Sequence, residues 1–376
     1  MDSPFDYTNY VTGPTFIGRG KEVALFCDTI KKRENVLLYG QARIGKRSLV
    51  YNSLNKLKQD GYSYRLIKMN LFNIRCIEAF MLKYTNIIFS HFANSPLEWS
   101  NMLKKYIPQA PYVFDQSEEF TKFIYTTKEL LANSQIEEIL NLPQRLANDY
   151  NTHIVIYIEQ FQDILLFDDS HRIFKLFEKV WETHNNVSYI ITGERKNAMD
   201  QIFEQDEYFY RLANKIELKP IDSEVFANFI VQGFLKGGKV IKQSQAEKLY
   251  NLVQGDPWYA QHLAAICYKM TSGYMTDDVL DDGVKALISL HEFMFHSVAY
   301  GLSKHQLRFI KAVLEGVTRF SSADILDKYN LNSSANVNRL KEALTKKEII
   351  TFNEHKEAIF IDPLLKLWFT NYSFVK

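Results

Sequence analysis

One short stretch near the N-terminus constrains the fold of this chain more than any other. Residues 35–50 read NVLLYGQARIGKRSLV: an apolar run ends in Gly40, a short loop follows, and Gly45-Lys46 opens a helical pattern. This is the order of the phosphate-binding loop G-x-x-x-x-G-K-[ST], in which backbone N–H groups and a helix N-terminus face a phosphate. A chance match inside another kind of α/β sheet is the alternative. The predicted phosphate-binding residues are Gly40, Gln41, Ala42, Arg43, Ile44, Gly45, Lys46, Arg47 and Ser48.

Arg47 is the one departure from that motif, because it stands where the motif has Ser or Thr. The missing hydroxyl is the group that coordinates Mg²⁺ in such loops. Lys46, which would reach the terminal phosphates, is present, and so are both glycines, which allow close approach of the backbone. The loop therefore keeps its phosphate cradle and lacks a metal ligand.

Apolar runs further along the chain predict parallel strands that are buried on both faces. The strongest run covers residues 153–163 and ends in an acidic residue, Glu159; residues 64–71, 187–195 and 215–220 are similar. Helical patterns lie between the runs, which favours a parallel sheet with right-handed crossovers. Ligands of such sheets bind at the carboxyl ends of the strands, where Gly40, Glu159 and Gly193 all fall.

The segments between the strands are assigned from apolar periodicity and breaker residues. We expect helices at residues 21–32, 47–59, 77–93, 116–132 and 134–150. Residues 95–111 contain three prolines and are interpreted as a surface excursion. Residues 1–15 are rich in turn formers and are expected to be a mobile arm.

The C-terminal part changes from a helical pattern to a helix-and-hairpin pattern. Residues 222–288 read as helices, one of which follows Gly255-Asp256-Pro257, and helices at about 303–314, 321–329 and 333–346 precede a hairpin at 349–361. Three helices and a hairpin make a winged helix-turn-helix. The expected domains are an arm at 1–15, a phosphate-binding α/β domain at 16–220, a helical lid at 221–290 and a winged helix-turn-helix at 291–376.

Composition excludes several other classes of protein. The 376 residues are 46% hydrophobic and 14% aromatic, which argues against disorder, and no apolar run approaches the ~18 residues of a membrane span. The net charge of +1 requires any nucleic-acid surface to be a local patch. Three scattered cysteines and an acidic N-terminus without a signal peptide lead us to expect a cytoplasmic protein.

Six short motifs, taken with their order and spacing, resemble the archaeal-ATPase-like family of AAA+/STAND P-loop ATPases. The resemblance spans about residues 14–370 and implies an ATP- or ADP-binding α/β domain, a helical lid and a winged helix. Its motifs are Phe16-Ile17-Gly18-Arg19 with Glu22, the loop Gly40–Ser48, Ile158-Glu159-Gln160-Phe161-Gln162, Ile191-Thr192-Gly193, Gly255-Asp256-Pro257 and the terminal winged helix.

The resemblance also shows where this chain departs from the family. The family's second motif, Walker B, ends in Asp-Glu-Phe-Gln; this chain has Glu159 at the Mg²⁺-coordinating Asp and Gln160 at the water-activating Glu. Glu159 could still face Mg²⁺ through one extra methylene. Gln160 cannot accept a proton from water, and loss of a general base costs about 10²–10⁴-fold in rate. Glu194 stands where Ser is usual. Hydrolysis is therefore expected to be weak or absent.

Five further positions carry expectations that depend on the resemblance. Arg195 and Arg211 could be sensor or finger arginines that reach a γ-phosphate, or could be solvated or paired with Glu194 and Glu207. Gly18 and Arg19 resemble the segment that borders the adenine. Pro257 belongs to a motif of the lid; independently, Asp256 as N-cap and Pro257 at the first helical position describe a helix start.

The predicted winged helix suggests a second kind of function, the binding of DNA or of another protein. Residues 303–376 contain 12 Lys or Arg against 8 Asp or Glu, a net charge of +4. Near the N-terminus of the presumed recognition helix, Ser334, Asn336, Arg339 and Lys341 could contact DNA bases and phosphates. Glu342 and Glu348 interrupt this basic patch, and a protein-contact role is the alternative.

The sequence as a whole predicts an ATP- or ADP-binding, STAND-like regulatory protein in which nucleotide occupancy sets how the domains pack. The alternative is a DNA- or protein-binding module on a vestigial P-loop scaffold that binds no nucleotide. A third reading is an active ATPase that uses Glu159 in an unusual way. The histidines are dispersed, so metal catalysis has no support in the sequence.

Overall fold

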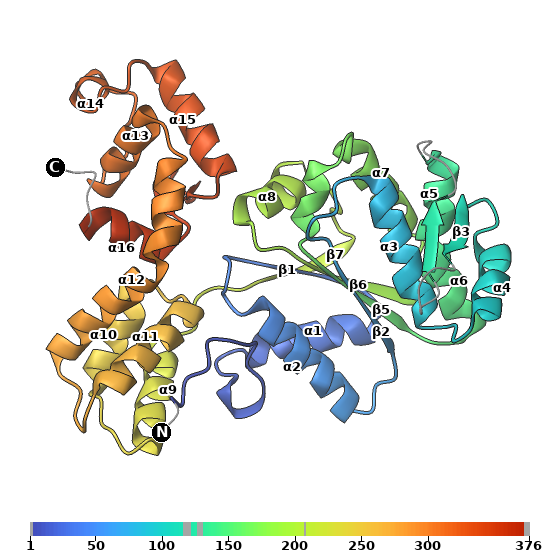
Figure 1. Ribbon diagram of the computed structural model, residues 1–376, viewed down its shortest axis with the longest axis horizontal. Coiled ribbons are helices and arrows are strands. Elements are labelled where there is room, and N and C mark those ends of the chain that lie inside the picture. The colour runs from blue at the N-terminus through green and yellow to red at the C-terminus, as the bar shows by residue number, and fades with distance from the viewer. Residues whose placement is uncertain (1–2, 116–121, 126–130, 207, 372–376) are drawn as a thin grey trace. The chain divides into compact units, whose positions relative to one another are not determined.

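A computed structural model describes residues 3–115, 122–125, 131–206 and 208–371 (Figure 1). The chain forms two compact units, each described here by itself. The sheet unit contains Gly20–Ala42 and Leu49–Leu218, and the helical unit contains Met1–Arg19, Arg43–Ser48 and Lys219–Lys376. The second half of the predicted phosphate-binding loop, residues 43–48, thus belongs to the helical unit, although the residues on both sides of it belong to the sheet unit.

The sheet unit is built on five parallel strands in the order β2-β5-β6-β1-β7. The three central strands β5, β6 and β1 are buried on both faces, as the sequence predicts for strands covered by helices on each side, whereas the edge strands β2 and β7 are only partly buried. The strands are β1 (Asn35–Tyr39), β2 (Arg65–Asn70), β5 (Ile154–Glu159), β6 (Val187–Thr192) and β7 (Ala213–Glu217).

Helices cover both faces of this sheet and complete its core. Figure 1 shows α1 (Gly20–Lys31) and α2 (Lys46–Gln59) on one face, and α3 (Ile77–Ser90), α7 (Ser170–Trp181) and α8 (Lys196–Asp200) on the other. Much of the chain's aromatic content is used here: the Trp181 ring stacks on Tyr189 at 4.0 Å between centroids. Phe161, at the end of the β5 segment, packs its ring 6.2 Å from Trp181.

Two expectations for residues 95–132 were wrong. Residues 95–111 contain a helix, α4 (Pro96–Tyr106), with Trp99 buried; Pro96 occupies the first turn, where a missing N–H costs nothing, and Ser95 caps the helix by accepting from Glu98 N. Residues 122–125 form β4, which pairs antiparallel with β3 (Tyr112–Asp115), and are not part of a helix. The rest of that predicted helix up to residue 130 lies outside the described residues.

The expected helix at 134–150 is two helices, α5 (Asn133–Leu140) and α6 (Leu142–Asp149). The break falls at Asn141, two residues before Pro143. Because proline has no N–H to bond the carbonyl four residues back, and its ring crowds that carbonyl, a helix cannot continue smoothly through Pro143. The apolar periodicity of residues 134–150 predicts one continuous helix, but Pro143 divides it in two.

In the helical unit, the part that follows the sheet unit in the chain starts with the helices α9 (Ser223–Lys236), α10 (Gln243–Leu252), α11 (Pro257–Met270) and α12 (Asp277–Tyr300). The winged helix follows as predicted. Ser303 forms a capping box at α13, and Ser333 caps α15. The C-terminal α16 was not predicted. The winged-helix elements are α13 (Lys304–Leu314), α14 (Ala323–Lys328), α15 (Ser334–Lys346), β8 (Ile350–Phe352), β9 (Ala358–Phe360) and α16 (Pro363–Asn371).

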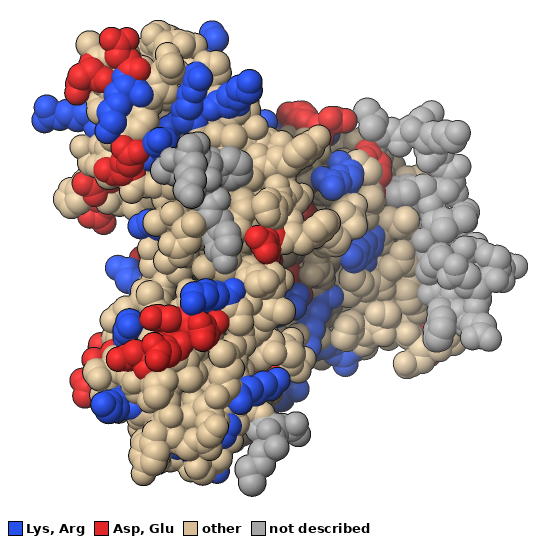
Figure 2. Space-filling view, turned by 60° about the vertical axis from the view of Figure 1, so that its left-hand side comes forward, with Lys and Arg blue, Asp and Glu red and all other residues tan. Residues whose placement is uncertain are grey.

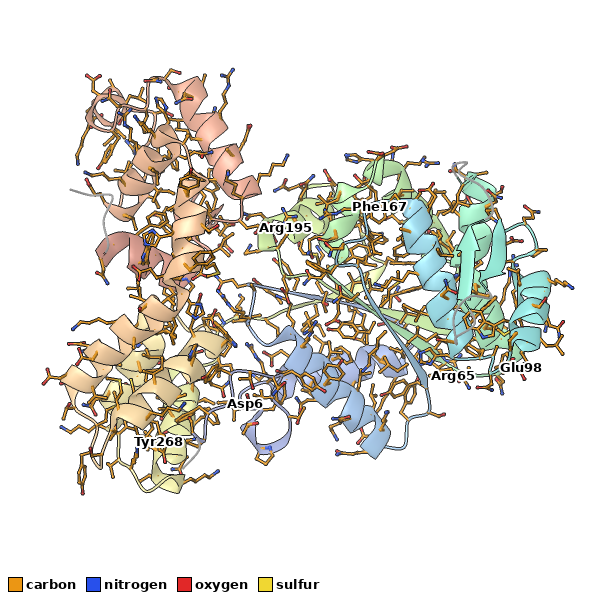
Figure 3. All side chains as sticks on the ribbon, in the orientation of Figure 1. Asp6, Arg65, Glu98, Phe167, Arg195 and Tyr268 are labelled. Carbon is orange, nitrogen blue, oxygen red and sulfur yellow. The ribbon has the colours of Figure 1, made fainter. Side chains whose placement is uncertain are left out.

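The N-terminal segment is packed onto the helical unit, contrary to the expected mobile arm. Phe5 is only 3% exposed and lies 5.8 Å from Phe234 and 6.4 Å from Tyr268 between ring centroids; Figure 3 labels Tyr268. A Cβ on Gly233 would come within 2.5 Å of the Phe5 ring, so the glycine makes room for it. Buried aromatic contacts outweigh the local turn preferences of this segment.

Candidate functional site

The loop between β1 and α2 has the backbone of a phosphate-binding nest. Its φ angles are +139° at Gly40, +61° at Arg43 and +102° at Gly45, and α2 begins at Lys46. Alternation of left-handed and right-handed residues turns successive N–H groups to one side, where they form an anion-binding concavity. Arg43 is the unexpected member, because a non-glycine residue rarely adopts positive φ unless its surroundings hold it there.

Side chains at the start of α2 differ in exposure. Lys46 and Ser48 are each only 7% exposed, whereas Arg47 is exposed. Ser48 Oγ accepts a hydrogen bond from the backbone N–H of Val11 at 3.1 Å. The hydroxyl next to Arg47 is therefore engaged by the N-terminal segment, which crosses the beginning of this helix.

Gly18 and Arg19 meet the second half of the loop within the helical unit. Arg19 is 5% exposed and donates from Nη2 to the carbonyl oxygen of Ile44 at 3.3 Å. Gly18 has φ +69°, and a Cβ there would lie 2.6 Å from Ile221 Cγ2. The structure thus brings together two segments that the resemblance assigned to the same nucleotide.

Pro257 and its cap also lie in this unit. Asp256 is 5% exposed, and its Oδ1 accepts from the N–H groups of Trp258 and Tyr259, each at 2.9 Å, so that Asp256 caps α11. Pro257 occupies the first helical position. Burial raises the pKa of the Asp256 carboxyl to about 6, and the nearby Arg43 guanidinium opposes that rise.

Arg43 connects the loop to Asp256 and to the winged helix, which sequence reasoning missed. Its Nη2 donates to Asp362 Oδ2 at 2.7 Å, and its Nε lies 3.6 Å from Asp256 Oδ2. The guanidinium carbon lies 4.2 Å from the centre of the Tyr259 ring. Burial lowers the pKa of Arg43, but Asp362, Tyr259 and Asp256 outweigh it, so the net shift is upward. A basic residue in the variable part of the loop was the available signal.

The segment predicted to be Walker B lies in the sheet unit at the end of β5. Glu159 Oε1 accepts from the Tyr157 hydroxyl at 3.0 Å. The chain then turns at Gln160, which has φ +58°, into a 3₁₀ turn at Phe161–Leu166. Gln162 Nε2 donates to Gln160 Oε1 at 2.6 Å and to Asp163 Oδ1 at 3.3 Å. The side-chain oxygen of Gln160 therefore accepts a hydrogen bond within its own turn.

The predicted sensor arginines lie in different surroundings. Arg195, labelled in Figure 3, directly precedes α8. Burial raises the pKa of the Asp163 carboxyl, and the charge of Arg195 opposes that rise. Arg211 is exposed at φ +65°, with its guanidinium 5.2 Å from the centre of the adjacent Tyr210 ring. The suggested partner Glu207 lies outside the described residues.

The predicted DNA-contacting residues of α15 divide into exposed and engaged side chains. Ser334 and Arg339 are exposed. Asn336 Nδ2 donates to Leu331 O at 3.0 Å, and Lys341 Nζ lies 5.4 Å from the centres of both the Phe320 and Phe352 rings. In Figure 2, Lys and Arg side chains at the top of the molecule are interspersed with acidic ones.

Two kinds of feature were not found in the part of the chain that the structure describes. Among these residues no group of three or more His, Cys, Asp or Glu side chains is arranged to hold a metal ion. Over the same residues, none of the helices combines the length and apolar character needed to cross a bilayer.

Comparisons with known proteins support the fold. Residues 293–371 match the family model of a probable winged helix domain. The structure is similar to the Walker-type ATPase PABY2304 of Pyrococcus abyssi at 16% identity and a TM-score of 0.63, over 97% of this chain and 99% of that one.

A second similar structure is the ORC2 protein of Aeropyrum pernix in its ADPNP–ADP complexes, at 14% identity and a TM-score of 0.57, over 95% of this chain and 93% of that one. A search of curated protein sequences gave no match. The chain thus shares the fold of these two proteins and has a C-terminal winged helix. These similarities describe the fold alone.

Proposed function

We propose that this protein binds ATP or ADP on the loop Gly40–Ser48 and acts as a STAND-like regulatory protein. The observation that carries the proposal is the loop backbone, with positive φ at residues 40, 43 and 45 directly before the N-terminus of α2. Such a nest offers several N–H groups to a phosphate, and the helix dipole adds to its attraction. That the similar ORC2 structure was obtained with ADPNP and ADP supports the choice of nucleotide.

The residues that would hold Mg²⁺ and activate water are altered, so we propose that hydrolysis is weak or absent. Mg²⁺ offsets charge on the β- and γ-phosphates. Glu159 is the one carboxylate at the Walker B metal position, and Arg47 supplies a cation in place of a hydroxyl ligand. Gln160 lacks the basicity to take a proton from water. Mg²⁺ is accordingly expected to contribute little to nucleotide affinity.

Calorimetric titration with ATP, with and without Mg²⁺, tests nucleotide binding. We expect binding in both conditions and at least a tenfold loss of affinity in Lys46→Ala, since the ammonium would contact the phosphates. Lys58→Ala is the matched control, because Lys58 is exposed on the same helix α2, and it should bind as the wild type does. Equal affinity of the Lys46→Ala variant and the wild type, or no binding by either, contradicts the proposal.

The second candidate is a DNA- or protein-binding module on a scaffold that binds no nucleotide. One observation favours it: Ser334 and Arg339 of α15 are exposed, on a winged helix whose sequence carries a net charge of +4. Exposed polar residues at the start of such a helix suit contacts to bases and phosphates. Failure of the titration combined with DNA binding would favour this alternative.

A further inference from the structure

Arg43, Asp256, Tyr259 and Asp362 form a cluster inside the helical unit, here named the Arg43 cluster. It joins the phosphate-binding loop to the N-terminus of α11 and to the N-terminus of α16. The contacts are close: Arg43 Nη2 to Asp362 Oδ2 is 2.7 Å, and the Tyr259 hydroxyl donates to the same oxygen at 2.9 Å.

Each carboxylate in the cluster divides its two oxygens between two tasks. Asp362 Oδ1 caps α16 by accepting from Leu364 N at 2.9 Å and Leu365 N at 3.0 Å, and its Oδ2 faces Arg43. Asp256 does the same at α11. The guanidinium is therefore the cation that ties both helix starts to the loop.

The backbone and the side chain of Arg43 serve different structures. The backbone of Arg43, at φ +61°, shapes the loop together with the backbones of Gly40 and Gly45, which also have positive φ. The side chain is held by the winged helix through Asp362. Any anion that settles on the loop would approach a residue whose positive charge is already paired with a carboxylate.

We propose that Asp362 and a nucleotide phosphate compete for the Arg43 guanidinium, so that phosphate binding on the loop loosens the attachment of the winged helix. This inference rests on the proposed nucleotide binding. A phosphate chain carries more negative charge than one carboxylate, and arginine pairs readily with phosphate oxygens. When the guanidinium turns to phosphate, Asp362 loses its cation, and the winged helix loses its ion pair with the loop.

Competition has a consequence that a purely structural contact lacks. Binding equilibria that share one group are reciprocal, so a contact that phosphate must break lowers the affinity for phosphate. Removing the competing carboxylate should strengthen nucleotide binding, and removing the guanidinium should weaken it. If the ion pair only stabilised the fold, both changes would weaken binding or leave it unaltered.

Titration of ATP into the full-length protein and three variants tests the competition. Asp362→Asn keeps an oxygen that can cap α16, so this variant should fold. We expect it to bind ATP about tenfold more tightly than the wild type, within the usual range of coupling between sites. Arg43→Gln should bind about tenfold more weakly. Asp327→Asn, an equal charge change on an exposed residue of α14, is the control and should bind unchanged.

Hydrogen exchange of the α16 amides gives a readout that does not depend on affinity. ATP should speed their exchange in the wild type, and in Arg43→Gln the exchange should already be fast without ATP. Unchanged or weaker binding by Asp362→Asn, while the wild type binds ATP, overturns the competition and leaves nucleotide binding intact. Absence of binding by the wild type and by Asp362→Asn overturns both proposals. If Arg43→Gln fails to fold, Asp362→Asn alone decides.

Discussion

At the residue scale, the sequence motif identified the loop but not the contacts that Arg43 makes from it. Gly40 and Gly45 could be predicted because only glycine adopts their φ values readily. Arg43 occupies a position where the motif accepts any residue. The motif therefore could not predict its left-handed backbone or its ion pair with Asp362. That partner lies far along the chain. Contacts of this kind arise from packing and have no local signal.

Restoring the altered motif positions should restore turnover. Arg47→Thr supplies the hydroxyl ligand for Mg²⁺, and Gln160→Glu supplies a general base. We expect the double variant to hydrolyse ATP about 10²–10⁴-fold faster than the wild type, the range for adding a general base. A phosphate-release assay with Mg²⁺ measures this. Gln162→Glu, which places the same new acid two residues away, is the control; a double variant no faster than this control would contradict the assignment of these positions.

At the scale of elements, the strands and most helices followed from the sequence, and the errors have identifiable causes. Buried parallel strands are continuous apolar runs, which are hard to mistake when turn residues bound them. Two of the errors at residues 95–150 involve proline: Pro96 lies in the first turn of α4, and Pro143 lies in the first turn of α6, directly after the break between α5 and α6. The third, the helix expected at 116–132, falls on a segment without proline, whose residues 122–125 pair with β3.

The exposed side chains of Ser334 and Arg339 on α15 lead to a prediction about nucleic acid. If the second candidate function is correct, fluorescence anisotropy with a duplex DNA should show binding at low salt that weakens as salt rises, because phosphate contacts release counterions. Arg339→Glu should then weaken binding and reduce the salt dependence. Lys236→Glu makes the same charge change at the exposed end of α9, outside the winged helix, and should have a smaller effect. Undetectable binding of the wild type at low salt would remove DNA from consideration.

At the scale of the whole molecule, each unit buries a histidine in its neutral form. In the sheet unit, burial lowers the pKa of His153 to about 4, and the charge of Arg33 adds a smaller contribution. In the helical unit, burial lowers the pKa of His262 to about 4, with smaller contributions from His291 and Lys269. The unfolded chain takes up these protons near pH 6.5, before the folded protein does. Stability from these groups is therefore full above pH 6.5 and is lost as the pH falls toward 4.

Replacement of His153 isolates one such contribution. His153 is 5% exposed, with its ring nitrogens 3.0 Å from the Tyr62 hydroxyl and 2.9 Å from Ser188 Oγ. Between pH 7 and pH 5 the wild type should lose about 2 kcal/mol more free energy of unfolding than His153→Gln, following 1.36 kcal/mol per pKa unit. Urea unfolding at both pH values provides the comparison. Equal losses in the two proteins would mean that His153 does not titrate as described.

The discontinuous make-up of the helical unit has a consequence for synthesis on the ribosome. Residues 43–48 emerge early, yet the groups that pair with Arg43 emerge only when Asp256 and then Asp362 have been made. Contacts between residues so distant in the chain close slowly, because the entropy of a long loop must be overcome first. The ion pair between the loop and the winged helix can therefore form only after Asp362 has been made, long after residues 43–48.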